Sequence, residues 1–362
     1  MGNLIQAVTK YLPYLDEVYK VASRSSVLET PSNFVRETAD AKTVMIAKTS
    51  MQGLGNYDKA NGFPVGDVTL TWESHTLSYD RGRSFSIDAM DNLETLGMSF
   101  GTLAGEFLRT RVIPEIDAVR FAKYCSGAGT TVAADLTASN TVTAIDTAET
   151  ALKEAEIDLS NAIIFMTPTV YANIKDDTTH FTRTLVPSEN PNRNFGSYDG
   201  MSIVEVPQTR FYSAVTLHDG RTDGQKNGGY EQKATQTTDT FTGDGDTKVF
   251  TLTAAASVLD EVKVDGTATA DYDLNGNELK FWTAPASGKA ITVKYGMGRD
   301  INFMIIKPEA VMQITKHAKM RVFDPDTNQT ADAYKVDYRI YHDGWVLENK
   351  KKGIYAHVKA TV

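Results

Sequence analysis

The stretch of sequence that decides the fold is TVMIAKTSMQGLGNYDKANGFPVGDVTLTWESHTLSY, residues 43–79. Its two ends, Thr43–Thr49 and Val68–Tyr79, show the apolar–polar alternation of strands, and the phase of the second run slips near Ser74. The segment between them is rich in glycine and includes a proline, as turns are. We therefore predict a long β-hairpin with a bulge and a projecting tip that has little to bury within its own chain.

A long helix is predicted after the hairpin. Asp91 and Glu94 form a capping-box-like start. Apolar residues then recur at spacings of three and four, which marks one core-facing stripe: Leu93, Leu96, Phe100, Leu103 and Phe107. Pro114 is expected to kink or break this helix near Ile113, after which a helical pattern continues to Gly127.

The next region alternates helices and strands. We predict a helix around 146–156, a buried strand over 161–166 and a further helix that starts at the Thr-Pro pair 167–168. A second unit of the same kind is expected at 301–306, followed by a helix through Ile314. These two units indicate one mixed sheet whose halves are separated by an insertion.

The insertion is a compositional island. Residues 235–297 are rich in Thr and Val, with short alternating runs separated by Gly, Asp, Asn and Pro turns, which predicts a small all-β domain. Its polar, Gly-rich approach, 222–238, is interpreted as a linker. The C-terminal stretch from Tyr334 returns to strands, and the N-terminal residues up to about 42 form an arm expected to pack on something else.

Composition limits the class of protein. A chain of 362 residues is long enough for two to three domains. It has no apolar run long enough to cross a bilayer and no signal-like start, so we expect neither export nor membrane insertion. Cys125 is the single cysteine, which excludes an intrachain disulfide. The net charge of -9 argues against a general phosphate-binding surface.

Motifs that resemble metal sites are better explained as turns. The first half of a calcium loop occurs at Asp271, Asp273, Asn275, Gly276 and Asn277, but Trp282 stands where the bidentate Glu should be. The same spacing recurs without glycine over 324–328. Two HDG triplets, 218–220 and 342–344, are also interpreted as turns. The remaining histidines, His75, His180, His317 and His357, are scattered, so we expect no metal site.

No catalytic motif is present. The sequence contains no P-loop, no dinucleotide fingerprint and no nucleophile elbow. The charged residues of the long-helix region are interpreted as solvated or inter-subunit ion pairs: Glu106 with Arg109, Glu115, Asp117 and Arg120. Lys350–Lys352 form a basic turn. We therefore expect no catalytic residues, no cofactor and no enzyme activity.

Several stretches resemble one branch of phage and prophage major capsid proteins: TLTWESHTLSYDRGRSFSID, GEFLRTRVIPEIDAVRFAKY, INFMIIKPEAVMQITKHAK and YRIYHDGWVLENKKKGIYAHV. The resemblance, to the Hong Kong phage type of capsid fold shared with encapsulins, covers nearly all of the chain outside about 235–298. It implies an α+β fold with an N-terminal arm, an extended E-loop hairpin, a spine helix, and peripheral and axial domains. The inserted β-unit looks like the immunoglobulin-like modules of phage structural proteins.

The resemblance also implies a domain division. The expected parts are an N-terminal arm (1–42), an E-loop hairpin (43–85), a peripheral domain with the spine helix (86–140), an axial domain (141–234), the inserted domain (235–297), an axial return (298–333) and peripheral C-terminal strands (334–362).

The function implied is that of a shell subunit. A projecting hairpin and an arm without its own core suit a protein that packs against copies of itself, in pentamers and hexamers of an icosahedral shell around double-stranded DNA. The expected partners are portal, scaffold and decoration proteins, and the expected location is the virion, assembled in the cytoplasm of a bacterial host. The inserted domain is expected on the outer surface. The alternative is an encapsulin-like nanocompartment shell.

Overall fold

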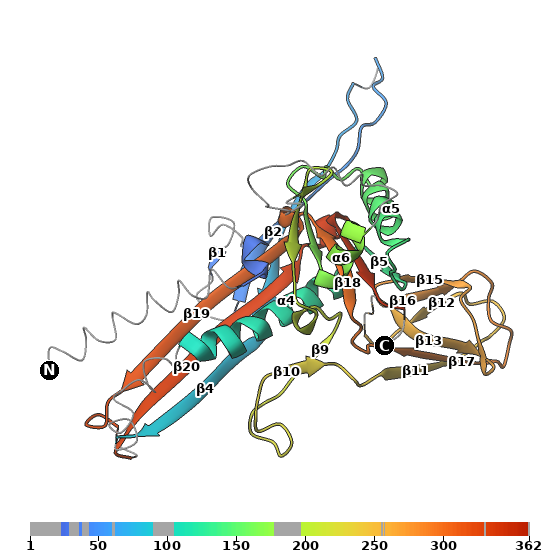
Figure 1. Cartoon of the computed structure of the whole chain (residues 1–362). Helices are drawn as coiled ribbons and strands as arrows, with labels where there is room; N and C mark the ends of the chain where they lie inside the picture. The colour runs from blue at the N-terminus through green and yellow to red at the C-terminus, as the bar shows by residue number, and fades with distance from the viewer. Residues whose placement is uncertain are drawn as a thin grey trace, which may run out of the picture. The chain divides into compact units, whose positions relative to one another are not determined.

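The computed structural model (Figure 1) describes residues 23–28, 36–37, 43–59, 62–89, 105–176, 197–254, 256, 258–328 and 331–360. The N-terminal helical pattern, the Asp91 helix start and most of the apolar stripe that follows it lie outside these residues. The chain divides into two compact units. One comprises the described residues of 1–28, 90–312 and 344–362, and the other those of 29–89 and 313–343.

The second unit contains the predicted hairpin. Strands β2 (Thr43–Met51) and β3 (Val68–Thr76) pair antiparallel, and the short β1 (Arg36–Glu37) adds to the β2 side. Their ladder runs without a break from Thr43↔Thr76 to Met51↔Val68, so the predicted bulge is wrong. The phase slip has another cause, because the chain leaves this sheet after β3 and enters a different sheet two residues later.

That other sheet consists of three long strands in the order β19-β20-β4. Strand β4 spans Tyr79–Asp88, β19 spans Val311–Phe323 and β20 spans Ala333–Val346. The helix expected through Ile314 is wrong, since only the 3-10 turn η5 (Pro308–Ala310) forms before β19 begins. Hydrogen bonding to β20 overrides the local helical pattern, as tertiary context often does.

The first unit is built on a six-stranded mixed sheet in the order β5-β21-β18-β6-β8-β7. The expected buried strands form its centre, with β6 and β18 buried along their whole lengths. Their bounds are β5 Thr130–Ala133, β6 Ile163–Met166, β7 Ser197–Tyr198, β8 Met201–Glu205, β18 Ile301–Ile306 and β21 Ile354–Val358.

Helices cover both faces of this sheet. Alternate residues of β18 join two separate cores: Met304 packs with Phe121 of α4 (Ile113–Ser126), whereas Phe303 packs with side chains of α5 (Thr141–Glu154) and α6 (Pro168–Asp176). The Thr167 hydroxyl accepts the Val170 N–H at 3.3 Å, which confirms the predicted start of α6.

The helical segment that leads into α4 continues past Pro114 without the predicted break. A π-helical turn, η3 (Leu108–Val112), precedes it, and the Ile113 N–H donates to the Leu108 carbonyl five residues back. A π-turn shifts the hydrogen-bond register, which lets a helix continue where a proline supplies no N–H. The pattern predicted from there to Gly127 is confirmed, since α4 ends at Ser126.

The C-terminal strands do not form one group. Strand β21 lies inside the six-stranded sheet between β5 and β18, after the 3-10 turn η6 (Glu348–Gly353), whereas β20 belongs to the three-stranded sheet. The peripheral assignment of 334–362 stays a prediction. The division between units falls at 343–344, within β20.

The insertion is a two-sheet sandwich, seen as β11–β17 in Figure 1. One sheet has the order β11-β17-β13-β14 and the other β12-β16-β15, with a shared apolar core. The strands are β11 Thr237–Thr242, β12 Val249–Thr251, β13 Leu259–Val264, β14 Thr267–Ala268, β15 Tyr272–Asn275, β16 Glu278–Phe281 and β17 Ala290–Tyr295. Its ends meet, since Thr237 pairs with Tyr295. An immunoglobulin-like relationship stays a prediction.

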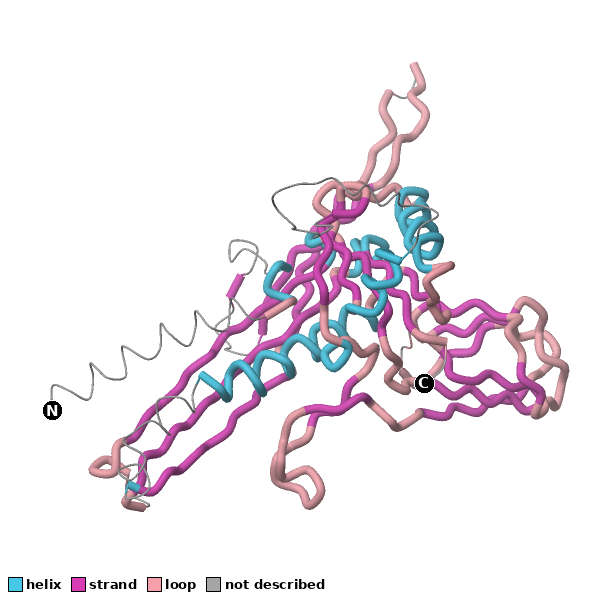
Figure 2. The backbone as a smooth tube through the Cα atoms, viewed as in Figure 1, coloured by secondary structure: helices cyan, strands magenta, loops and turns pink. Residues whose placement is uncertain are grey.

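The approach to the sandwich is not a plain linker. Strands β9 (Val215–Leu217) and β10 (Tyr230–Gln232) form a hairpin, drawn in Figure 2 as two short strands joined by a long loop. Most of the stretch interpreted as linker therefore belongs to this hairpin loop and to β10. Its glycines serve the loop, because Gly220, Gly224, Gly228 and Gly229 all have positive φ.

Candidate functional site

The hairpin of β2 and β3 presents an apolar face. In the regular ladder, Met51 lies directly opposite Val68, so their side chains are on the same face of the hairpin. Side chains two residues apart along a strand also share a face, which places Leu70 and Trp72 on the same face as Val68. Their exposed fractions are 73% for Met51, 70% for Val68, 57% for Leu70 and 48% for Trp72. We call these four side chains the hairpin face.

The tip of the hairpin adds an aromatic pair. A bridge between Asp58 and Gly62, with the Gly62 N–H donating to the Asp58 carbonyl at 2.7 Å, closes a small loop. It brings the Tyr57 and Phe63 rings to 4.9 Å, although Phe63 remains 82% exposed. Gly62 has a φ of 77°, a backbone conformation that residues with a Cβ atom rarely adopt.

The hairpin face and the tip together hold most of the strongly exposed large apolar side chains of the described residues. Leu54 and Val65, at 107% and 94% exposed, extend the apolar surface along the tip. Contiguous exposed apolar surface marks an interaction site, and aromatic side chains dominate binding energy at such sites. The arrangement can therefore bind another apolar protein surface.

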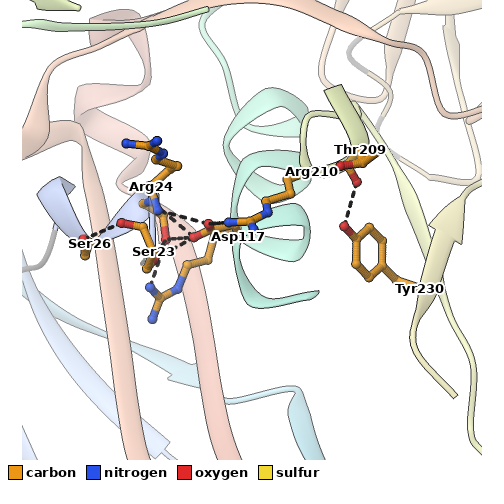
Figure 3. Close-up of polar contacts among 9 residues, drawn as sticks. Ser23, Arg24, Ser26, Asp117, Thr209, Arg210 and Tyr230 are labelled. Carbon is orange, nitrogen blue, oxygen red and sulfur yellow. Dashed lines mark hydrogen bonds and ion pairs between the residues drawn. The ribbon is translucent and has the colours of Figure 1, made fainter. Parts of the chain in front are cut away.

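A buried polar cluster anchors the chain that emerges from the N-terminal region (Figure 3). The fully buried carboxylate of Asp117 on α4 accepts the Ser23 hydroxyl at 2.7 Å and the Ser25 hydroxyl at 2.8 Å. It also accepts the backbone N–H of Arg24 at 3.0 Å and that of Ser25 at 3.2 Å. These bonds hold the start of η1 (Ser25–Leu28) against α4.

Arg210 pairs with the buried carboxylate of Asp117, and Arg120 bonds to another member of the same cluster. The Arg210 guanidinium, in the 3-10 turn η4 (Gln208–Arg210), lies 3.4 Å from the carboxylate, and Arg120 donates to the Ser25 hydroxyl at 3.1 Å. Figure 3 also shows the Tyr230 hydroxyl donating to the Thr209 carbonyl, at 2.6 Å, which ties η4 to β10. Burial raises the pKa of Tyr230 to about 12, so this donor stays protonated at neutral pH.

The prediction that Asp117 and Arg120 form solvated or inter-subunit ion pairs is wrong, because both side chains are buried within the chain. Of that set, Glu106 and Arg109 do form an exposed ion pair, as expected. The sequence does hold a signal for the buried cluster. Asp117 lies four residues after Ile113 and four before Phe121, so all three share one helix face, and both apolar neighbours are fully buried.

The structure confirms only some of the motifs that were interpreted as turns. Residues 271–277 form the β15–β16 hairpin, in which Asn275 pairs with Glu278 and Gly276 has a φ of 62°, so the turn interpretation is confirmed. The triplet 218–220 starts the loop after β9, where Asp219 accepts the N–H of Thr222. The triplet 342–344 is not a turn, because it lies within β20 with all three residues buried.

The described residues offer little for other kinds of site. Within the described ranges, no group of three or more His, Cys, Asp and Glu side chains could hold a metal ion. Lys350–Lys352 lie in η6, where the Lys350 ammonium is 3.9 Å from Glu309. No helix among the described residues is long and apolar enough to span a membrane.

Comparison with known proteins identifies the fold. No protein-family model matches the chain, and no curated protein matches its sequence. A structure of Mycobacterium phage Che8 superimposes with a TM-score of 0.51 at 11% identity, covering 89% of this chain and 86% of that one. The capsid structure of Cyanophage P-SCSP1u gives 0.50 at 11% identity, with 92% and 87% covered.

A virus-like particle from Pyrococcus furiosus gives a TM-score of 0.42 at 8% identity, covering 96% of this chain and 99% of that one, a score too low to support an argument. The two phage superpositions establish the fold. The chain has the α+β capsid fold of the Hong Kong phage type, which confirms the fold expected from the sequence.

Proposed function

We propose that this chain is the major capsid protein of a tailed phage or prophage and assembles into an icosahedral shell that encloses double-stranded DNA. The observation that carries the proposal is that a capsid fold extends over about nine-tenths of the chain. The exposed hairpin face supports it, because that surface needs a neighbouring subunit to cover it.

The role proposed is structural rather than catalytic. Assembly into a closed shell requires each subunit to bury surface against several neighbours, and the hairpin face with its tip offers one such surface. The location that follows is the virion, with assembly in the bacterial cytoplasm. Portal, scaffold and decoration proteins are the further partners that such a shell would need.

The experiment is purification of the full chain after expression in bacteria, followed by electron microscopy and mass spectrometry of any particles. Closed shells of uniform diameter without a dedicated protein cargo support the capsid proposal. Shells that co-purify with one stoichiometric cargo protein would favour an encapsulin-like nanocompartment. A chain that stays monomeric at high concentration, while folded, would contradict both.

A further inference from the structure

Arg299 occupies the junction between the sandwich and the six-stranded sheet. It follows β17, the last strand of the insertion, and precedes β18, the central strand of the sheet. It is only 6% exposed. A buried guanidinium needs partners that offset the loss of its hydration, and Arg299 takes them from both sides of the junction.

The partner on the sandwich side is Asp260 in β13. One guanidinium nitrogen of Arg299 lies 3.1 Å from the Asp260 carboxylate, whose side chain is also buried. The second carboxylate oxygen accepts the Met297 backbone N–H at 3.2 Å. Asp260 therefore ties the body of the sandwich to the chain segment that leaves it.

The partners on the other side are carbonyl oxygens after β21. The second terminal nitrogen of Arg299 donates to the carbonyls of Lys359 and Ala360. Because β21 is an inner strand of the six-stranded sheet, this nitrogen is bonded to the body that carries the insertion. One side chain thus contacts both bodies.

The backbone at the junction is also tied down. The Gly298 N–H donates to the Lys233 carbonyl at 2.7 Å, and the Arg299 N–H donates to the Ser213 hydroxyl at 2.8 Å. A Cβ at Gly298 would lie 2.4 Å from the Ala214 carbonyl oxygen, so this close approach requires glycine. In addition, Val258 at the edge of the sandwich packs against the core beneath α4.

We propose that Arg299 is a positioning residue that fixes the sandwich to the six-stranded sheet, so that the insertion is a rigid extension of the subunit. Inserted domains joined by polar linkers move relative to their hosts by default. Here a buried ion pair, the hydrogen bonds at the junction and the packing of Val258 oppose that motion. In a shell of the proposed kind, every copy of the sandwich would then project at the same angle.

Removing the insertion would test whether shells need it, and the Arg299–Asp260 pair decides which variant is suitable. Replacing 235–297 by a short linker would delete Asp260 and so remove the carboxylate that pairs with Arg299, which is destabilising for reasons unrelated to assembly. A deletion that also carries Arg299→Gln removes that charge and is the better test of whether the sandwich is needed for shells.

The experiment measures the spread of distances between two spin labels in the free subunit. Cysteines introduced at the exposed positions Thr143 on α5 and Thr251 on β12 place one label on each body, since native Cys125 is buried. The spread is compared for the parent chain, Arg299→Gln, Asp260→Asn and the control Lys289→Gln. The control breaks an exposed ion pair with Asp265 inside the sandwich.

A narrow distribution is expected for the parent and the control, and a distribution at least twofold broader for the two junction variants. Amide exchange at Met297 and Gly298 should rise at least tenfold in those variants, while β13 and β17 stay protected. A broad distribution in the parent chain would overturn the proposal even if the variants fail to fold. So would an unchanged distribution in folded Arg299→Gln. Neither outcome depends on whether the chain forms shells.

Discussion

Truncating one ring at the hairpin tip should weaken assembly without unfolding the subunit. Phe63 is 82% exposed in the free chain and touches Tyr57. Full burial of a phenylalanine side chain contributes about 1.5–3 kcal/mol, and nearly all of that remains to be gained when the tip meets a neighbour. Phe63→Ala should therefore weaken the contact between each hairpin tip and its neighbouring subunit by about 2 kcal/mol.

A loss of about 2 kcal/mol corresponds to about a thirtyfold rise in the subunit concentration at which shells form. The free energy of unfolding should change by less than about 0.5 kcal/mol, as is usual for exposed positions. Val249→Ala is the matched control, because Val249 is an exposed apolar residue on the sandwich, outside the hairpin.

The assay is light scattering over a concentration series, with urea denaturation of dissociated subunits as the check on folding. Assembly of Phe63→Ala at the parent's threshold, with normal subunit stability, would refute the assignment of the tip to a subunit contact. An equal loss for Val249→Ala would show that the effect is not specific to the hairpin.

Three further predictions concern the first unit. Phe121→Ala should lower the free energy of unfolding by about 3–5 kcal/mol in urea titrations, because the ring is fully buried with Phe165 and Phe211 at 5.1 Å; a loss below about 1 kcal/mol would mean that the core collapses around the gap. Asp117→Ala should lower the free energy of unfolding by about 3–5 kcal/mol and speed tryptic cleavage at Arg24. Asp117→Asn should lower it less, because the amide oxygen still accepts hydrogen bonds. Equal cleavage rates in the parent and Asp117→Ala would contradict the anchoring role. Burial lowers the pKa of His357 to about 4, although the nearby Asp135 acts in the opposite direction. The unfolded chain therefore binds more protons than the folded chain between about pH 4 and 6.5, so stability falls as the pH drops through that window. The free energies of unfolding from urea titrations at pH 7 and 4.5 should differ less in His357→Gln than in the parent.

The sequence predicted elements well where one local signal dominates. The alternation in 43–51 and 68–76 predicted the hairpin, and Thr167 with Pro168 predicted the start of α6. The continuous apolar run at 163–166 and the mostly apolar run at 301–306 predicted the buried centre of the sheet. These signals arise from residues near one another in the chain, so a single sequence contains them.

The errors arise where distant residues decide the conformation. Val311 begins a strand because β20 offers a hydrogen-bonding partner, and the triplet at 342–344 continues through a strand for the same reason. The Asp117 cluster joins residues more than 90 positions apart, and Arg299 meets Asp260 across 39. The spacing of residues along the chain does not predict contacts between residues that are distant in sequence.

The central claim is that this chain builds a closed shell in which its hairpin is covered by a neighbour. A cryo-electron microscopy reconstruction of purified particles tests it most directly. We predict icosahedral symmetry, with Met51, Val68, Leu70 and Trp72 of each copy buried against an adjacent subunit. Closed shells that leave this face in solvent would contradict the role of the hairpin, and a folded chain that forms no shell would contradict the account itself.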